Sequence, residues 1–257
     1  MLKIIFLDFD NTLYSHQQHS IPKSATKALS DLQAKGIKVF LSTGRSLVEL
    51  RKFDLGDFKY DGIVAMNGQI IYDQNNKIIK SKPIQPELKN KIKKVFESKK
   101  APLAIMGLDE IYINYLNPYV IDIFNMISTA LPKEKPFNTN KDFYMACMFL
   151  DGEDSEKMLD EFKGVANLTY WYEKGVDIID KDVSKASGIK DVLDMLNLKK
   201  EESISFGDGE NDLEMMSATG VSVAMGNAVD DIKEKATYVT DSIDDDGLAK
   251  ALEKYFN

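Results

Sequence analysis

The sequence predicts an α/β protein whose core is a doubly wound, Rossmann-like parallel sheet. Short apolar runs alternate with helix-length segments at both ends of the chain, which is the order that places a helix between neighbouring parallel strands. Three of these runs are followed directly by polar clusters, which begin at Asp8, Ser42 and Asp208. Ligands bind at the carboxyl ends of the strands in such sheets, so we expect these clusters to gather along one edge.

The composition excludes several classes of function. The chain has 257 residues, of which 44% are hydrophobic and 29% are charged, enough for one large domain or two smaller ones. The net charge of −8 argues against nucleic acid or an anionic membrane as a partner. The apolar runs are too short to span a bilayer, and Asp8 interrupts the apolar start too early for a signal peptide. The single cysteine, Cys147, lies in an apolar run and predicts a buried free thiol, which fits a cytoplasmic protein.

The first polar cluster follows the apolar run 4–7, which we interpret as a strand buried on both faces. Side chains alternate along a strand, so Asp8 and Asp10 would leave the same face. Two close carboxylates stay ionised together only if a cation lies between them, and Mg²⁺ suits oxygen ligands best. The alternative is that Asp10 and Asn11 form an ordinary turn at the strand exit.

The second cluster follows a strand predicted over 37–41, after a helix that begins near Pro22 and ends near Lys35. A further helix is predicted over 46–53. The hydroxyls of Ser42 and Thr43, the small Gly44 and the free N–H groups of the next helix together favour an anion site. A helix cap with a turn is the alternative interpretation.

The chain then changes character. Strands predicted over 63–66, 69–73 and 77–80 form hairpins, the first through a tight Asn67-Gly68 turn. Prolines at Pro83 and Pro86 indicate a linker. The middle of the chain lacks strict alternation and predicts a separate α+β domain. Its predicted helices cover 87–100, 119–128 and 155–163, and its strands cover 103–106, 110–114, 144–150, 168–172 and 176–179.

The last third returns to alternation and carries the third cluster. Helices are predicted over 184–196, 213–218, 228–236 and 247–256, and strands over 203–206, 221–225 and 237–240. Asp208 and Asp212 follow the strand that ends at Phe206. Lys185 is a candidate for a phosphate site, although most lysines are ordinary surface residues. His16 and His19 make a poor metal site and are predicted to be solvated.

Four segments, in this order, resemble the motifs of the haloacid dehalogenase-like (HAD) phosphohydrolases. Residues 8–12 match the DxDxT motif, and residues 42–45 are similar to the second motif. Lys185 resembles the lysine of the third, and residues 207–212 resemble the fourth. Because four ordered motifs are hard to obtain by chance, the resemblance is specific.

The long insertion between the second motif and the lysine resembles the cap domain of the Cof-type sugar-phosphatase-like branch. Residues 224–228 with Lys233 and Asp246-Gly247 are also typical of that branch. One departure is Ala186, where many relatives carry glycine, and a helix tolerates alanine better. The resemblance implies a core over 1–81 and 182–257 and an inserted α+β cap over 82–181 that selects the substrate.

The resemblance implies a Mg²⁺-dependent phosphatase that hydrolyses small phosphorylated metabolites, a sugar phosphate or similar phosphomonoester, through an aspartyl-phosphate. Asp8 is then the nucleophile and Asp10 the general acid and base. Mg²⁺ is held by Asp8, the backbone carbonyl of Asp10, and Asp208. The phosphate is assigned to Ser42, Thr43, Gly44, Lys185 and Asn211, with Asp212 in a supporting role.

Two alternatives stay open at this point. A phosphomutase uses the same aspartate pair, although with a different, smaller cap. A non-catalytic phosphate-sensing protein, such as a receiver domain, also places acids, a hydroxyl and a lysine at strand ends, but needs about half this length. A haloacid dehalogenase is disfavoured because Asp10 supplies the acid that phosphate-ester cleavage needs. The residues do not decide between Ser42 and Thr43 as the main phosphate hydroxyl, nor among substrates or oligomeric states.

Overall fold

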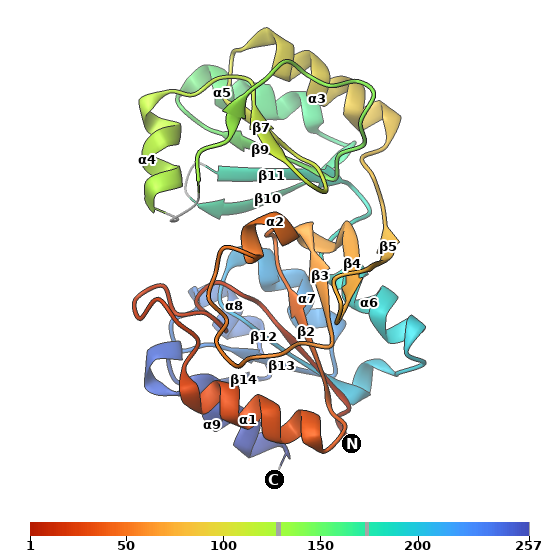
Figure 1. The fold of residues 1–257 in the computed structure, drawn as a ribbon, viewed down its shortest axis with the longest axis vertical. Helices are drawn as coiled ribbons and strands as arrows, with labels where there is room; N and C mark the ends of the chain where they lie inside the picture. The colour runs from red at the N-terminus through yellow and green to blue at the C-terminus, as the bar shows by residue number, and fades with distance from the viewer. Residues whose placement is uncertain (127–129, 173–174, 257) are drawn as a thin grey trace. The chain divides into compact units, whose positions relative to one another are not determined.

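The computed structural model describes residues 1–126, 130–172 and 175–256 and contains two compact units (Figure 1). The first comprises Met1–Arg45, Lys52–Ser81 and Ser184–Asn257, and the second comprises Ser46–Arg51 and Lys82–Val183. The short segment Ser46–Arg51 therefore groups with the inserted part of the chain, although the sequence places it in the predicted core. The assignment of 82–181 as a cap that selects the substrate stays a prediction.

The first unit is built on an eight-stranded sheet in the order β14-β13-β12-β1-β2-β3-β4-β5. The six strands from β14 to β3 pair in parallel, whereas β4 and β5 are added antiparallel, as the predicted hairpins require. The prediction of a doubly wound α/β core is thus confirmed. The strands are β1 (Ile4–Leu7), β2 (Lys38–Ser42), β3 (Gly62–Ala65), β4 (Ile70–Asp73), β5 (Ile78–Ser81), β12 (Ser203–Gly207), β13 (Val221–Ala224) and β14 (Tyr238–Val239).

Strand β1 lies in the middle of this sheet and is buried along its whole length, because helices cover parallel sheets on both faces. Phe6 and Val64 pack against Val192 and Met215 of the helices on one face. Helices α1 and α9 pack against each other, as do α6 and α7 (Figure 1). The bounds of the helices are α1 (Lys23–Ala34), α6 (Lys185–Met195), α7 (Leu213–Ala218), α8 (Asp230–Lys235) and α9 (Gly247–Phe256). Within the described ranges, no helix has the length and apolar character needed to cross a bilayer.

The second unit has a six-stranded sheet in the order β10-β11-β9-β6-β7-β8, antiparallel except for the pair β7–β8. Its apolar core includes Ile92, Ile105, Met148 and Phe162. Cys147 is buried in β9 as a free thiol, as predicted. The elements are α2 (Leu47–Leu50), α3 (Pro86–Ser98), β6 (Leu103–Met106), β7 (Ile111–Ile113), α4 (Pro118–Met126), β8 (Lys133–Glu134), β9 (Met145–Phe149), α5 (Glu153–Met158), β10 (Ala166–Tyr172) and β11 (Gly175–Asp180).

Two local predictions differ from the structure, and one strand was not predicted. The helix predicted over 46–53 covers only Leu47–Leu50. The predicted two-residue turn at Asn67-Gly68 is a 3₁₀ turn, Met66–Gly68, in which Asn67 and Gly68 have φ values of 52° and 101°. Strand β8 was not predicted, because two residues in a polar loop carry no periodic signal. The predicted helix over 119–128 is described only to Met126, so its last residues lie outside the described ranges.

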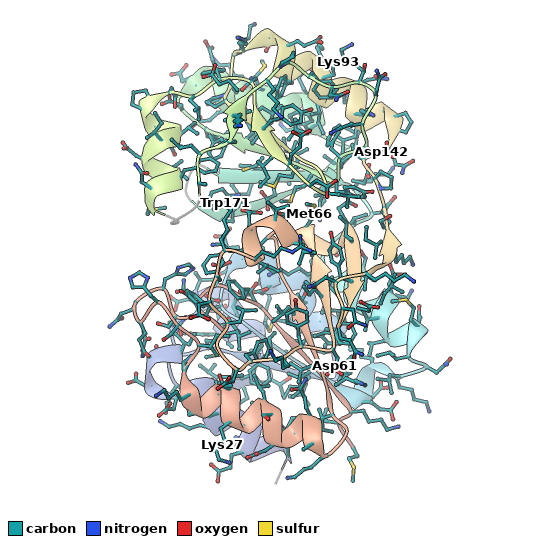
Figure 2. All side chains as sticks on the ribbon, in the orientation of Figure 1. Lys27, Asp61, Met66, Lys93, Asp142 and Trp171 are labelled. Carbon is teal, nitrogen blue, oxygen red and sulfur yellow. The ribbon has the colours of Figure 1, made fainter. Side chains whose placement is uncertain are left out.

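Asp61, labelled in Figure 2, ties the start of β3 to β2 and α1. Its Oδ2 accepts from the Val39 amide at 2.9 Å and from Gln33 Nε2 at 3.0 Å, and its Oδ1 accepts from Lys38 Nζ at 2.7 Å. Partial burial raises the pKa of the Asp61 carboxyl, but the hydrogen bonds from Lys38, Gln33 and Val39 outweigh it, so this pKa lies below its ordinary value.

We expect Asp61→Asn to lower the free energy of unfolding at neutral pH by about 1–3 kcal/mol, because the buried Val39 amide and the partly buried Gln33 amide lose a charged partner. Since the folded pKa is depressed, this contribution is complete above the unfolded pKa of about 3.9 and is lost as the pH falls through the folded value. Urea denaturation of both proteins between neutral pH and pH 3 checks this. Asp57→Asn, at an exposed position nearby, is the control; a penalty that is equal at all pH values contradicts the prediction.

Candidate active site

Asp8 directly follows the central strand β1, and its backbone N–H donates to Phe206 O of β12 at 3.0 Å. The side chain is buried. The parallel register pairs Leu7 with Leu41 of β2 and with Phe206 of β12, so the polar residues that follow these strands meet beside Asp8. The three polar clusters thus lie along one edge of the sheet, as predicted.

Lys185 is the first residue of α6, and its side chain is only 1% exposed. Its Nζ lies 2.5 Å from Asp8 Oδ1 and 2.7 Å from Asp212 Oδ1. Ser184 caps α6 by accepting a hydrogen bond from the Ser187 amide, which fixes Lys185 as the first residue of the helix. The alternative of an ordinary surface lysine is therefore wrong.

The turn at Gly68 explains how α6 comes so close to the sheet. A Cβ at Gly68 would lie 2.2 Å from Ser184 O, and its φ of +101° is one that side chains rarely adopt. A Cβ at Gly188 would likewise lie 2.4 Å from Val64 Cγ1. These two glycines allow the first turn of α6 to contact the β3–β4 turn, and the approach brings Lys185 to Asp8.

Asp208 and Asp212 lie on the loop after β12. Asp212 Oδ2 accepts from the Asp208 amide at 3.0 Å and the Gly209 amide at 3.2 Å, so the loop curls around its own carboxylate. Thr12 Oγ1 donates to Asp208 Oδ1 at 2.7 Å, which links this loop to the segment after Asp8.

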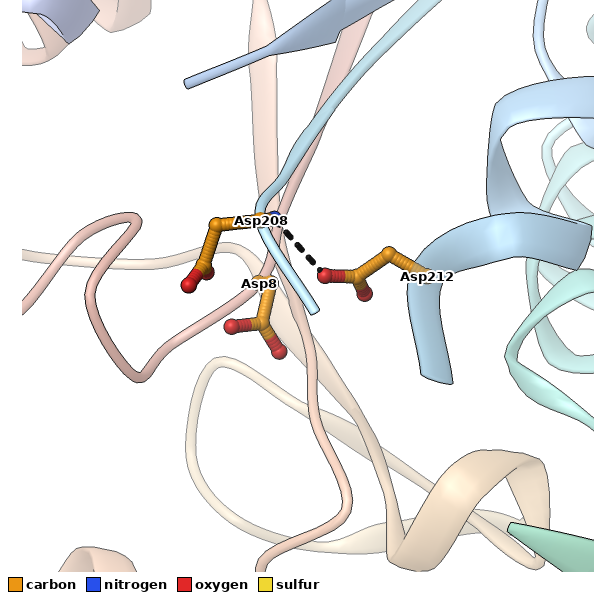
Figure 3. A group of neighbouring side chains, drawn as sticks. All are labelled: Asp8, Asp208 and Asp212. Atoms are coloured by element: carbon orange, nitrogen blue, oxygen red, sulfur yellow. Dashed lines mark hydrogen bonds between the residues drawn. The ribbon is translucent and has the colours of Figure 1, made fainter. Parts of the chain in front are cut away.

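The carboxylates of Asp8, Asp208 and Asp212 converge (Figure 3), and one oxygen from each lies within 4.8 Å of the others. Three acids face one ammonium, Lys185, so the group is short of positive charge. Burial and then the nearby Asp212 raise the pKa of Asp8 well above its ordinary value and the pKa of Asp208 to about 7. Burial lowers the pKa of Lys185, but Asp212 and Asp8 outweigh it and raise the value. An all-oxygen donor set with unbalanced negative charge fits a hard divalent cation.

Asp10 has a different environment. Arg45 Nε donates to its Oδ2 at 2.8 Å, Arg45 Nη2 donates to its Oδ1 at 2.7 Å, and His16 Nε2 lies 2.5 Å from the same Oδ1. Burial raises the pKa of Asp10, but the hydrogen bonds from His16 and Arg45 outweigh it and hold the pKa far below its ordinary value. Neither contact was predicted: His16 was expected to be solvated, and Arg45 was given no role, although it belongs to the segment that resembles the second motif.

The two hydroxyl candidates are both buried at the end of β2. Thr43 Oγ1 accepts from the Arg45 amide at 3.0 Å and keeps its own hydrogen to donate. Ser42 Oγ has no hydrogen-bond partner among the described residues. Gly44 is half-buried between Thr43 and Arg45, and Asn211 is half-buried on the loop between Asp208 and Asp212.

Comparison with known proteins identifies the family. The family model of haloacid dehalogenase-like hydrolases matches residues 5–252. The chain belongs to this family. "Putative phosphatase YkrA" of Bacillus subtilis (strain 168) is 32% identical over 98% of this chain and 97% of its own length. "5-amino-6-(5-phospho-D-ribitylamino)uracil phosphatase YitU" of the same organism is 27% identical over 99% and 97%.

Solved structures of this hydrolase family agree with the fold. The HAD subclass IIB sugar phosphatase BT4131 has a TM-score of 0.86 and 30% identity, over 98% of each chain. The phosphatase BT1666 from Bacteroides thetaiotaomicron has a TM-score of 0.88 and 29% identity, over 99% of this chain and 95% of its own. The predicted family and the predicted Rossmann-like core with an inserted α+β part are thus confirmed. The chain is a hydrolase of this family, and relatives named as phosphatases agree with the prediction that it acts on phosphate esters.

The charge deficit of the three-acid group leads to a binding prediction. Mg²⁺ is expected to raise the thermal unfolding midpoint, because a ligand that binds only the folded state at 100 times its Kd adds about 2.7 kcal/mol. In EDTA, Asp208→Asn should unfold at a higher temperature than the wild type, since one of three repelling carboxylates is gone, and should respond less to Mg²⁺. Differential scanning fluorimetry measures both. Asp245→Asn, at an exposed acid, should behave as the wild type; equal Mg²⁺ responses in all three proteins contradict the prediction.

Proposed function

We propose that this HAD-like hydrolase is a Mg²⁺-dependent phosphatase that hydrolyses small phosphorylated metabolites, sugar phosphates or similar phosphomonoesters, through an aspartyl-phosphate. One observation carries the proposal. The buried Asp8 lies 2.5 Å from Lys185 Nζ, and its carboxylate lies close to those of Asp208 and Asp212. This arrangement supports a nucleophile, a cation and a set of metal donors acting at one strand end.

Asp8 is the proposed nucleophile. A carboxylate oxygen attacks phosphorus in line with the ester oxygen, the P–O ester bond breaks, and the phosphoryl group is transferred to Asp8. The attack brings the negatively charged Asp8 carboxylate towards a negatively charged phosphate. Lys185 offsets this repulsion because its ammonium already contacts Asp8, and Asp212 holds that ammonium from the other side at 2.7 Å.

The donors proposed for Mg²⁺ are the carboxylates of Asp8 and Asp208 and the backbone carbonyl of Asp10. Bound there, Mg²⁺ would supply positive charge that keeps Asp8 ionised and neutralises phosphate oxygens. The carboxylate of Asp10 faces Arg45 and His16, which supports assigning only its backbone carbonyl to the metal, as the resemblance implies. Thr12 orients Asp208 through its 2.7 Å hydrogen bond.

Asp10 is the proposed general acid and base. The contacts with Arg45 and His16 favour its ionised form, so Asp10 must first take up a proton, which it gives to the alkoxide as the aspartyl-phosphate forms. It then regains a proton from the water that hydrolyses the intermediate. A receiver domain needs no such residue, so the second carboxylate favours turnover over phosphate sensing. The phosphatase names of the relatives favour hydrolysis over the phosphomutase alternative.

The phosphate oxygens are assigned to donors around Asp8. Thr43 keeps a hydroxyl hydrogen to donate, and the buried Ser42 hydroxyl lies at the end of the neighbouring strand without a partner among the described residues. Gly44 allows close backbone approach, and Asn211 supplies an amide. We assign the choice of substrate to residues 82–181. The sugar phosphatase and the ribitylaminouracil phosphatase among the relatives make phosphorylated sugars and sugar alcohols the first candidates for a substrate panel.

Asp8→Asn is expected to abolish phosphate release from p-nitrophenyl phosphate in the presence of Mg²⁺, because an amide oxygen is a very weak nucleophile. A loss of at least about 10⁴-fold is expected for a group that forms the covalent intermediate. A malachite-green assay measures release, and mass spectrometry of acid-quenched wild type should find phosphate on the peptide that contains Asp8. Asp245→Asn is the control. Wild-type activity in Asp8→Asn, or phosphate on another residue, contradicts the mechanism.

A further inference from the structure

The side chain of Asn227 joins three loops that follow β1, β13 and β14 in the first unit. Its Nδ2 donates to Asn11 O at 2.9 Å, and its Oδ1 accepts from the Ile243 amide at 3.0 Å. A carbonyl oxygen only accepts and a backbone N–H only donates, so these two partners fix the orientation of the Asn227 amide. Asn227 belongs to the segment 224–228, which has no part in the mechanism proposed above.

The turn that contains Asn11 is otherwise hydrogen-bonded to itself. Asn11 has a φ of 54°, its amide donates to Tyr14 O at 2.9 Å, and the Tyr14 amide donates to Phe9 O at 2.8 Å. Among the described residues, the bond from Asn227 is the only hydrogen bond that joins the backbone of residues 10–14 to another loop. The backbone around Asp10 and Asn11 is therefore restrained from outside by Asn227.

The two segments that Asn227 joins also hold Asp208. Thr12 Oγ1 donates to Asp208 Oδ1 at 2.7 Å, and the Val229 amide donates to Asp208 O at 3.0 Å. Thr12 follows Asn11, and Val229 lies two residues after Asn227, so the bond from Asn227 to Asn11 closes a ring of contacts through Asp208. If that bond is removed, the ring opens, and Thr12 alone connects the turn to Asp208.

A contribution to stability does not account well for this bridge. Asn227 is exposed, and a hydrogen bond that water can replace adds little to the free energy of unfolding. Orientation of metal donors is the better explanation. Residues that hydrogen-bond to the ligands of a metal fix their geometry, and loss of such a residue typically weakens metal binding by roughly 10- to 100-fold.

We propose that Asn227 is a positioning residue for Mg²⁺ binding. By holding Asn11 O, it fixes the turn that carries the backbone carbonyl of Asp10 and, through Thr12, the carboxylate of Asp208. Both groups are proposed donors to the metal, so the inference rests on the proposed function. It adds a residue outside the four motifs, whose part is to keep two donors from different loops at a fixed separation.

The test separates the two contacts of the Asn227 side chain. Asn227→Ala removes both. Asn227→Asp keeps an oxygen for the Ile243 amide but replaces the donor with a second oxygen, which repels Asn11 O. Titrations in 0.5 M KCl screen the added negative charge. Asn75→Ala, at an exposed asparagine on the turn between β4 and β5, is the matched control.

Isothermal titration calorimetry of the metal-free full chain with Mg²⁺ measures the Kd, and differential scanning fluorimetry in EDTA measures the unfolding midpoint of the same proteins. We expect both Asn227 variants to raise the Kd for Mg²⁺ by about 10-fold or more, because the donors are no longer held in place. Their midpoints in EDTA should stay close to that of the wild type, and Asn75→Ala should match the wild type in both measurements.

Three results would overturn the inference while leaving the proposed function in place. One is a wild-type Kd in Asn227→Ala. Another is a lower midpoint in EDTA with an unchanged Kd, which is the behaviour of a purely structural residue. The third is a raised Kd in Asn227→Ala but not in Asn227→Asp, since the effect would then belong to the contact with Ile243. If the wild type itself binds no Mg²⁺, the metal site is wrong, and the proposed function fails together with this inference.

Discussion

The site depends on one buried ion-pair group, in which Lys185 Nζ contacts both Asp8 and Asp212. Removing one partner from such a group leaves an uncompensated charge away from water, at a cost of about 3–5 kcal/mol. Lys185 begins α6, Asp8 directly follows β1 and Asp212 lies after β12, so the group joins three parts of the chain that are far apart in sequence. The relative positions of these elements are consequently set by electrostatics as well as by apolar packing.

The two aspartates of the first motif are two residues apart but have opposite environments. Asp8 is buried with other acids around it, which raises its pKa, whereas Asp10 faces Arg45 and His16, which lower it. The same strand end thus favours the uncharged form of one carboxyl group and the charged form of the other. Strand β1 brings Asp8 and Asp10 to the same end of the sheet, and side chains from other parts of the chain give the two carboxyl groups different surroundings.

The alternation of apolar runs and helices was enough to predict the core, and the four ordered motifs pointed to Lys185, Asp208 and Asp212, which lie near Asp8. Strand ends in a parallel sheet converge by geometry, so no knowledge of the intervening chain was needed. The role of Arg45 could have been inferred from its place beside Thr43 and Gly44. His16 could not, because its contact with Asp10 depends on the reversal of residues 11–14, and a polar loop carries no periodic signal. The length of α2 was overestimated because neither a proline nor a glycine marks its end.

The contact of Gly68 with Ser184 O has a bearing on how this architecture diversifies. The chain leaves the first unit after Ser81 and re-enters it at Ser184. Ser184 contacts the turn at Gly68, which comes before Ser81 in the sequence. Both residues of this contact therefore lie outside the inserted segment 82–183. Changes among residues 82–183 alter neither residue of this contact, whereas a side chain at position 68 would collide with Ser184 O, directly before Lys185.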